Sequence, residues 1–125
     1  MREGASTCAT CGICGGYFLI EADGSIYPCD FYAVDEWNCG NIFDNSLLEI
    51  QKNKTYISFM EFGKEKPIEC QNCKYRILCN GGCKNDCEDG HNYYCESFKI
   101  FFDYAIDRLL EIGRAEILMR KQMMK

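Results

Sequence analysis

The sequence predicts a small, cysteine-rich α+β domain. We expect a β-hairpin, then short helices and cysteine-bearing loops, and finally a long amphipathic helix. Three observations support this class. The chain has 125 residues, of which 11 are cysteine, so it holds one domain at most. β-Prone runs with a turn signal occur near the N-terminus, and helical periodicity dominates the C-terminus. The expected parts span residues 1–45, 46–96 and 97–122.

The hairpin is predicted from two β-prone runs, residues 17–20 and 26–27. Between them, Asp23 and Gly24 form a dipeptide that tolerates the positive φ angle of a tight turn. Pro28 has no N–H group to donate to a neighbouring strand, so the second strand is expected to end there.

Three helices are predicted next. Ser46 is an N-cap residue for a short helix that fades by Asn53, and a second short helix covers residues 55–62 and ends at Gly63. From Ser97 onward, apolar residues recur on one helical face over about 25 residues. We expect this face to pack on the hairpin and the cysteine loops. Its members are Phe98, Phe101, Phe102, Ala105, Leu109 and Ile112.

Charge and hydropathy exclude several classes of function. The net charge is −5, which disfavours binding to nucleic acid or to an anionic membrane surface. The apolar runs are far shorter than the ~20 residues that a membrane-spanning helix needs. Residues 1–7 contain no apolar segment typical of an export leader, so we expect a cytoplasmic location that keeps thiols reduced.

The cysteine spacing predicts metal binding. Hydrophobic residues make up 47% of the chain, but that share includes the cysteines, so a thin core needs the folding free energy that a metal supplies. One group has the spacing Cys-x2-Cys-x5-Cys-x3-Cys and comprises Cys70, Cys73, Cys79 and Cys83. A second pair, Cys14 and Cys29, flanks the hairpin, whose antiparallel strands bring the two thiols together.

Three kinds of cysteine chemistry compete. Staggered, cysteine-only spacing favours iron–sulfur clusters. A structural zinc domain is the alternative, but zinc modules usually pair two Cys-x2-Cys units about 15 to 20 residues apart. Here the unit at Cys11 and Cys14 lies much farther from the one at Cys70 and Cys73. A disulfide scaffold is disfavoured by the odd number of cysteines.

The full pattern resembles the SPASM domain, the auxiliary-cluster extension of radical SAM peptide-modifying enzymes. The pattern runs Cys-x9-Gly-x4-Cys, then Cys-x2-Cys-x5-Cys-x3-Cys, then a last cysteine, Cys95. Residues 21–32, 40–42 and 92–98 resemble the anaerobic sulfatase-maturating enzymes in particular, and the similarity covers about residues 8–112.

The resemblance implies two 4Fe-4S clusters with crossed ligation. The first would be held by Cys8, Cys14, Cys29 and Cys83, and the second by Cys70, Cys73, Cys79 and Cys95. Cys11 is an alternative to Cys8. With Cys8 as the ligand, the spare cysteines are Cys11, Cys39 and Cys87, which are expected to be buried or inert thiols. Basic residues beside these cysteines are expected to offset cluster charge locally; they are Lys74, Arg76, Lys84 and Lys99.

The resemblance also implies a catalytic role for Asp30. In the maturases, the acid at this position is considered the base that deprotonates the target side chain. The chain lacks the Cys-x3-Cys-x2-Cys loop of a radical SAM core, so S-adenosylmethionine would bind only to a core domain outside this sequence. The chain would then be an incomplete part of an oxidoreductase, similar to the C-terminal part of a maturase.

The implied function is electron transfer and docking of an unfolded sulfatase peptide, during oxidation of a Cys or Ser to formylglycine. The implied partners are the radical SAM core domain, the peptide and an external electron acceptor. Two alternatives remain open. One is a structural zinc-binding domain, and the other is the auxiliary domain of a different radical SAM peptide modifier, such as a thioether-forming maturase.

Overall fold

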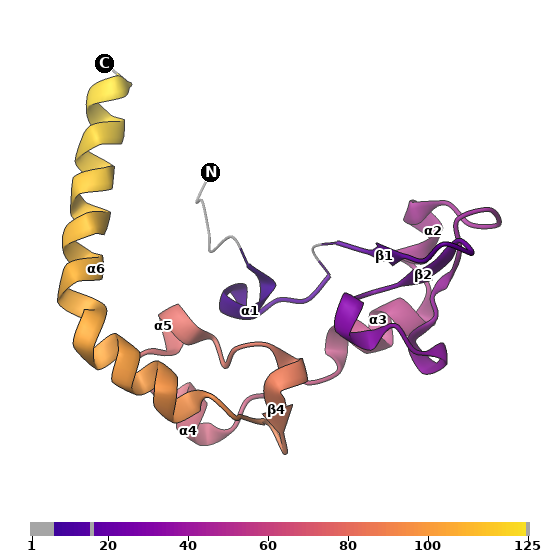
Figure 1. Cartoon of the computed structure of the whole chain (residues 1–125), viewed down its shortest axis with the longest axis horizontal. Coiled ribbons are helices and arrows are strands. Elements are labelled where there is room, and N and C mark those ends of the chain that lie inside the picture. Colours follow the sequence, from indigo (N-terminus) through magenta and orange to yellow (C-terminus); the bar gives the residue numbers. More distant parts are fainter. Residues whose placement is uncertain (1–6, 16, 125) are drawn as a thin grey trace. The chain divides into compact units, whose positions relative to one another are not determined.

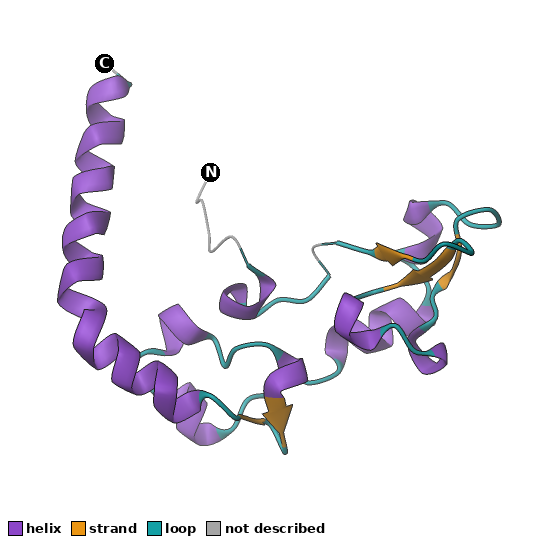
Figure 2. Ribbon diagram, in the orientation of Figure 1, coloured by secondary structure: helices purple, strands orange, loops and turns teal. Residues whose placement is uncertain are grey.

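The computed structural model describes residues 7–15 and 17–124. Residues 1–6, which include most of the segment expected to lack a leader, lie outside this range. The chain divides into two compact units, the first ending at Tyr93 and the second beginning at Tyr94. Figures 1 and 2 show small strands together with many helices, so the predicted α+β class is confirmed. None of the described helices is long and apolar enough to cross a membrane.

The first unit contains short elements joined by loops. In chain order its helices and strands are α1 (Cys8–Cys11), β1 (Leu19–Ile20), β2 (Ser25–Tyr27), the 3-10 helices η1 (Asp30–Tyr32) and η2 (Asp35–Trp37), β3 (Gly40–Asn41), α2 (Leu47–Ile50), α3 (Lys54–Glu61), α4 (Ile68–Gln71), α5 (Arg76–Cys79), the 3-10 helix η3 (Lys84–Asp86), β4 (Cys87–Glu88) and β5 (His91–Asn92). The second unit holds α6 (Cys95–Met123).

The predicted hairpin forms, and a third strand extends it. β1 pairs antiparallel with β2, so that Leu19 lies opposite Tyr27. β3 pairs with the other edge of β2, where Ile26 lies opposite Gly40. We did not predict β3, because two residues are too few to carry an alternating pattern.

The turn between β1 and β2 requires glycine at position 24. Gly24 has φ +86°, and a Cβ atom there would lie 2.6 Å from Asn41 Oδ1 and 2.7 Å from the Phe43 ring. Gly24→Ala would therefore combine backbone strain with a steric clash, and we expect a loss of roughly 1–3 kcal/mol in unfolding free energy. Thermal denaturation checks this against Gly113→Ala in α6, because a Cβ at Gly113 meets no atom within 4 Å. Equal melting temperatures for the two variants would contradict the expectation.

The core of the first unit has two adjoining parts. Behind the sheet, the buried side chains of Ile26, Cys39, Ile50 and Tyr56 pack together. Beyond them, the fully buried ring of Phe59 on α3 anchors a group of aromatic side chains. Its neighbours are Tyr32, with ring centroids 5.1 Å apart, and Trp37, at 5.2 Å, while Phe62 lies 5.5 Å from Trp37.

Local sequence signals explain where the helices begin. Ser46 caps α2 in a capping box, in which its side chain accepts from the Glu49 N–H and Glu49 Oε2 accepts from the Ser46 N–H. The Asn53 side chain caps α3 by accepting from the Thr55 N–H at 2.7 Å. Both short helices occur close to where the sequence predicts them. Helix α6 has 29 residues and begins at Cys95, two residues before the predicted start.

Candidate metal centre

Three of the predicted ligands line one cavity of about 130 Å³. Cys8 comes from α1, Cys14 from the loop that follows, and Cys83 from the loop after α5. Helix α1 ends at Gly12, whose φ of +68° turns the chain so that residues on both sides face the cavity. The structure therefore brings together thiols that are up to 75 positions apart in the sequence.

Cys29 belongs to the same neighbourhood, since burial and the nearby thiols of Cys83, Cys29 and Cys14 raise the pKa of Tyr32 to about 12. Burial also raises the pKa of the Cys29 thiol itself, and Cys29 and Cys8 both act electrostatically on Tyr17. Cys29 is thus near both tyrosines, whereas Cys8 acts on Tyr17 alone and the thiols of Cys14 and Cys83 act on Tyr32 alone.

The predicted donors of this region are all cysteine thiols. Among the described residues, no three His, Cys, Asp or Glu side chains lie close enough together to hold one metal ion. A 4Fe-4S cluster instead takes four thiolates distributed around its several iron atoms. Cysteine-only donors around a common cavity fit that requirement, and four thiolates also suit a structural zinc ion.

Asp30 lies directly beside this region. Its Oδ1 accepts a hydrogen bond from the Tyr17 hydroxyl at 3.2 Å and lies 3.4 Å from Cys29 Sγ. Asp30 begins η1, and its side chain is exposed. The carboxylate is thus both held by a neighbour and accessible from outside, an arrangement compatible with proton transfer to or from a bound substrate.

The second predicted group occupies α4, α5 and the turn between them. Cys70 and Cys11 line a cavity of about 180 Å³ together with Arg76 and Asn80. The Tyr75 backbone N–H donates to Cys73 Sγ at 3.4 Å, and Cys79 is the last residue of α5. Cys95 is the first residue of α6 and so belongs to the second unit.

A run of left-handed residues joins the two cysteine groups. Asn80, Gly81 and Gly82 all have positive φ angles, of 49°, 83° and 71°, and they lead the chain from Cys79 to Cys83. The Asn80 side chain donates to the Thr10 carbonyl at 2.6 Å. This hydrogen bond fixes α1 against α5, so one amide positions the loops that carry both groups.

The spare thiols differ in their surroundings. Cys39 is 1% exposed and belongs to the core behind the sheet. Cys87 Sγ donates to the Cys83 carbonyl at 3.3 Å, and the Asn92 side chain donates to the same carbonyl at 3.4 Å. Cys87 and Asn92 therefore hold the backbone of Cys83 in place through hydrogen bonds to its carbonyl oxygen.

Three residues of this region have contacts that the sequence does not predict. Lys84 was expected near a cluster, but its burial was not foreseen, since nothing in the sequence separates it from the other basic residues beside cysteines. Neither Tyr17 nor the side chain of Asn80 is given a role by the sequence. The Asn-Gly-Gly run was a usable signal for a left-handed turn, although it could not reveal that the Asn80 amide reaches Thr10.

Known proteins are similar to most of this chain. Curated relatives include a cysteine-type anaerobic sulfatase-maturating enzyme of Clostridium perfringens, 40% identical over 116 residues, and a serine-type anaerobic sulfatase-maturating enzyme of Bacteroides thetaiotaomicron, 30% identical over 114 residues. The alignments cover 87% and 84% of this chain but only 31% and 27% of those enzymes. The chain therefore spans about a third of their length or less.

Solved structures give the same result. Native anSMEcpe with bound AdoMet and the Kp18Cys peptide superposes with a TM-score of 0.84 at 39% identity, covering 89% of this chain and 32% of that one. The family model for SPASM, an iron-sulfur cluster-binding domain, matches residues 6–74, more than half of the sequence. From its cysteine pattern, its fold and these matches, the chain belongs to the SPASM family of iron–sulfur cluster-binding domains.

Proposed function

We propose that the chain binds two 4Fe-4S clusters and acts as the electron-transfer and peptide-docking part of a radical SAM sulfatase maturase. The observation that carries this proposal is that Cys8, Cys14 and Cys83, which are distant in the sequence, line one cavity of the first unit. The relatives, named as sulfatase-maturating enzymes, supply the reaction. The second cluster would be held by Cys70, Cys73, Cys79 and Cys95.

The proposed reaction can be written in steps that account for every proton and electron. Oxidation of a serine CH₂OH group to the aldehyde removes two electrons and two protons. One hydrogen atom leaves Cβ to a radical that the core domain generates. One proton passes to Asp30, and the remaining electron passes through the domain to an external acceptor. When bound, the clusters supply the redox centres for that last transfer.

This chain's own residues would prepare the proton transfer. The Tyr17 hydroxyl donates to Asp30 Oδ1 and so holds the carboxylate in place. The second oxygen, Oδ2, is then free to face a hydroxyl or thiol of the substrate peptide. Since the Asp30 side chain is exposed, a peptide can approach it without local unfolding.

Anaerobic reconstitution of the chain with iron and sulfide tests the proposal. We expect about eight irons and eight sulfides per chain, as two clusters of the 4Fe-4S type require. Metal and sulfide analysis gives the stoichiometry, and electron paramagnetic resonance after reduction shows whether two signals are present. Stoichiometric zinc without sulfide would contradict the proposal and favour a structural zinc domain.

A further inference from the structure

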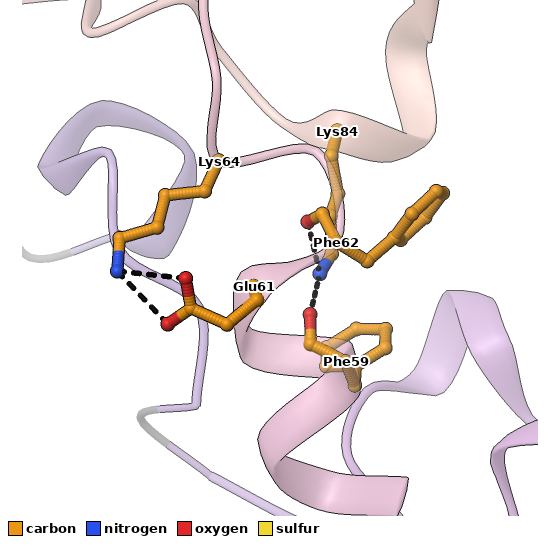
Figure 3. Close-up of polar contacts among 5 residues, drawn as sticks. All are labelled: Phe59, Glu61, Phe62, Lys64 and Lys84. Atoms are coloured by element: carbon orange, nitrogen blue, oxygen red, sulfur yellow. Dashed lines mark hydrogen bonds and ion pairs between the residues drawn. The ribbon is translucent and has the colours of Figure 1, made fainter.

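Lys84 is the one charged side chain that is buried among the described residues, with 8% of its surface exposed. Its Nζ donates to the carbonyl oxygens of Phe59 and Phe62 at 2.5 and 3.1 Å, as Figure 3 shows. The ammonium also lies 3.4 Å from the centroid of the Phe59 ring and 5.1 Å from that of Phe62. Lys84 therefore sits against the C-terminal end of α3.

No carboxylate among the described residues pairs with this ammonium. Carbonyl oxygens and ring faces compensate for part of the lost hydration, but burying a charge remains costly unless an opposite charge lies nearby. The nearby groups that can become anionic are sulfurs: burial lowers the pKa of Lys84, and the thiols of Cys14, Cys29 and Cys83 oppose that shift. These three cysteines are predicted ligands of the first cluster, and Cys83 directly precedes Lys84 in the sequence.

Lys64 lines the same cavity but differs from Lys84 in its exposure and its charge pairing. Both Lys64 and Lys84 line the cavity that Cys8, Cys14 and Cys83 share. The Lys64 side chain is 64% exposed and its Nζ lies 2.9 Å from Glu61 Oε1, a pair that Figure 3 shows beside Lys84. Its charge is thus balanced locally and screened by water. The Lys84 charge is neither balanced by a carboxylate nor screened to that extent.

We propose that Lys84 is a built-in counter-ion for the first cluster. Its fixed positive charge would stabilise the more negative, reduced form of the cluster and so raise the reduction potential. Its two hydrogen bonds to α3 would hold that charge at a constant position beside Cys14, Cys29 and Cys83. Lys84 is a positioning residue in this role, and the inference rests on the proposed function because it requires a cluster at these cysteines.

The test compares reconstituted chains by protein-film voltammetry. In Lys84→Met, which keeps the length of the side chain but removes its charge, we expect one of the two reduction potentials to become more negative. The other potential should stay unchanged. Lys84→Arg keeps the charge and should stay close to the native value. Lys64→Met, the matched control from the same cavity, should shift neither potential.

Iron and sulfide content, together with a second neutral variant, separates the possible failures. If the native chain binds no iron and sulfide, the proposed function fails. If native and Lys84→Met chains bind equal iron and sulfide but have the same potentials, or if Lys84→Arg shifts as much as Lys84→Met, the inference is overturned. If Lys84→Met does not bind its clusters, Lys84→Gln replaces it in the comparison, because glutamine removes the charge but retains a hydrogen-bond donor. Cluster loss from both neutral variants but not from Lys84→Arg would support a requirement for the charge.

Discussion

Replacement of Cys83 by alanine is expected to remove about four of roughly eight irons and one of the two cluster signals. Cys29→Ala should remove the same signal, because both thiols would hold the first cluster. Cys79→Ala should remove the other signal, although Cys79 lies only four positions from Cys83. The physical reason is that the left-handed turn after Cys79 redirects the chain, and Cys83 then lines a cavity with Cys8 and Cys14.

Iron analysis and electron paramagnetic resonance of the reduced variants measure this outcome. Cys39→Ala is the matched control, because Cys39 is also a thiol of the first unit but lies in the core behind the sheet. The Cys39→Ala variant should keep both cluster signals and lose only some of its unfolding free energy. Loss of one and the same signal in Cys79→Ala and Cys83→Ala would contradict crossed ligation.

Replacement of Asp30 by asparagine should lower formylglycine production by about 10²–10⁴-fold, the usual contribution of a general base. The measurement requires a complete maturase that contains this segment fused to its radical SAM core. Asparagine is nearly isosteric with aspartate and still accepts the Tyr17 hydrogen bond, so the geometry is retained while the basic oxygen is lost. Mass spectrometry of a substrate peptide quantifies the product.

Asp35→Asn is the control for this experiment. Asp35 is an exposed acid at the start of the next 3-10 helix, five residues farther along the chain, and we assign it no role. Its variant should retain full activity, and both variants should keep their full iron content. Undiminished formylglycine production by Asp30→Asn would dismiss Asp30 as the base.

The elements predicted correctly are those whose signals are local. Asp23 and Gly24 determine the first turn because one residue needs positive φ, and Ser46 begins α2 through contacts made within three residues. The long helix is evident because its periodicity extends over many turns. Each of these signals lies within a few neighbouring positions, so one sequence suffices to find it.

The features that escaped prediction depend on distant residues. β3 forms because Gly40 pairs with Ile26 at the second edge of β2. The burial of Lys84 depends on its contacts with the end of α3, which lies more than 20 positions earlier in the sequence. The cysteine groups were identified from spacing, but the convergence of Cys8, Cys14 and Cys83 on one cavity came only with the structure. A single sequence contains no measure of such long-range proximity.

The hydrogen bond from Asn80 to the Thr10 carbonyl has a consequence for biosynthesis. It joins residues that are 70 positions apart, so the early thiols leave the ribosome well before their structural neighbours exist. Closing so long a loop is entropically costly and slow. During that interval the thiols of the nascent chain remain open to oxidation and to capture by stray metal ions, so a reducing, metal-buffered setting for translation would favour correct assembly.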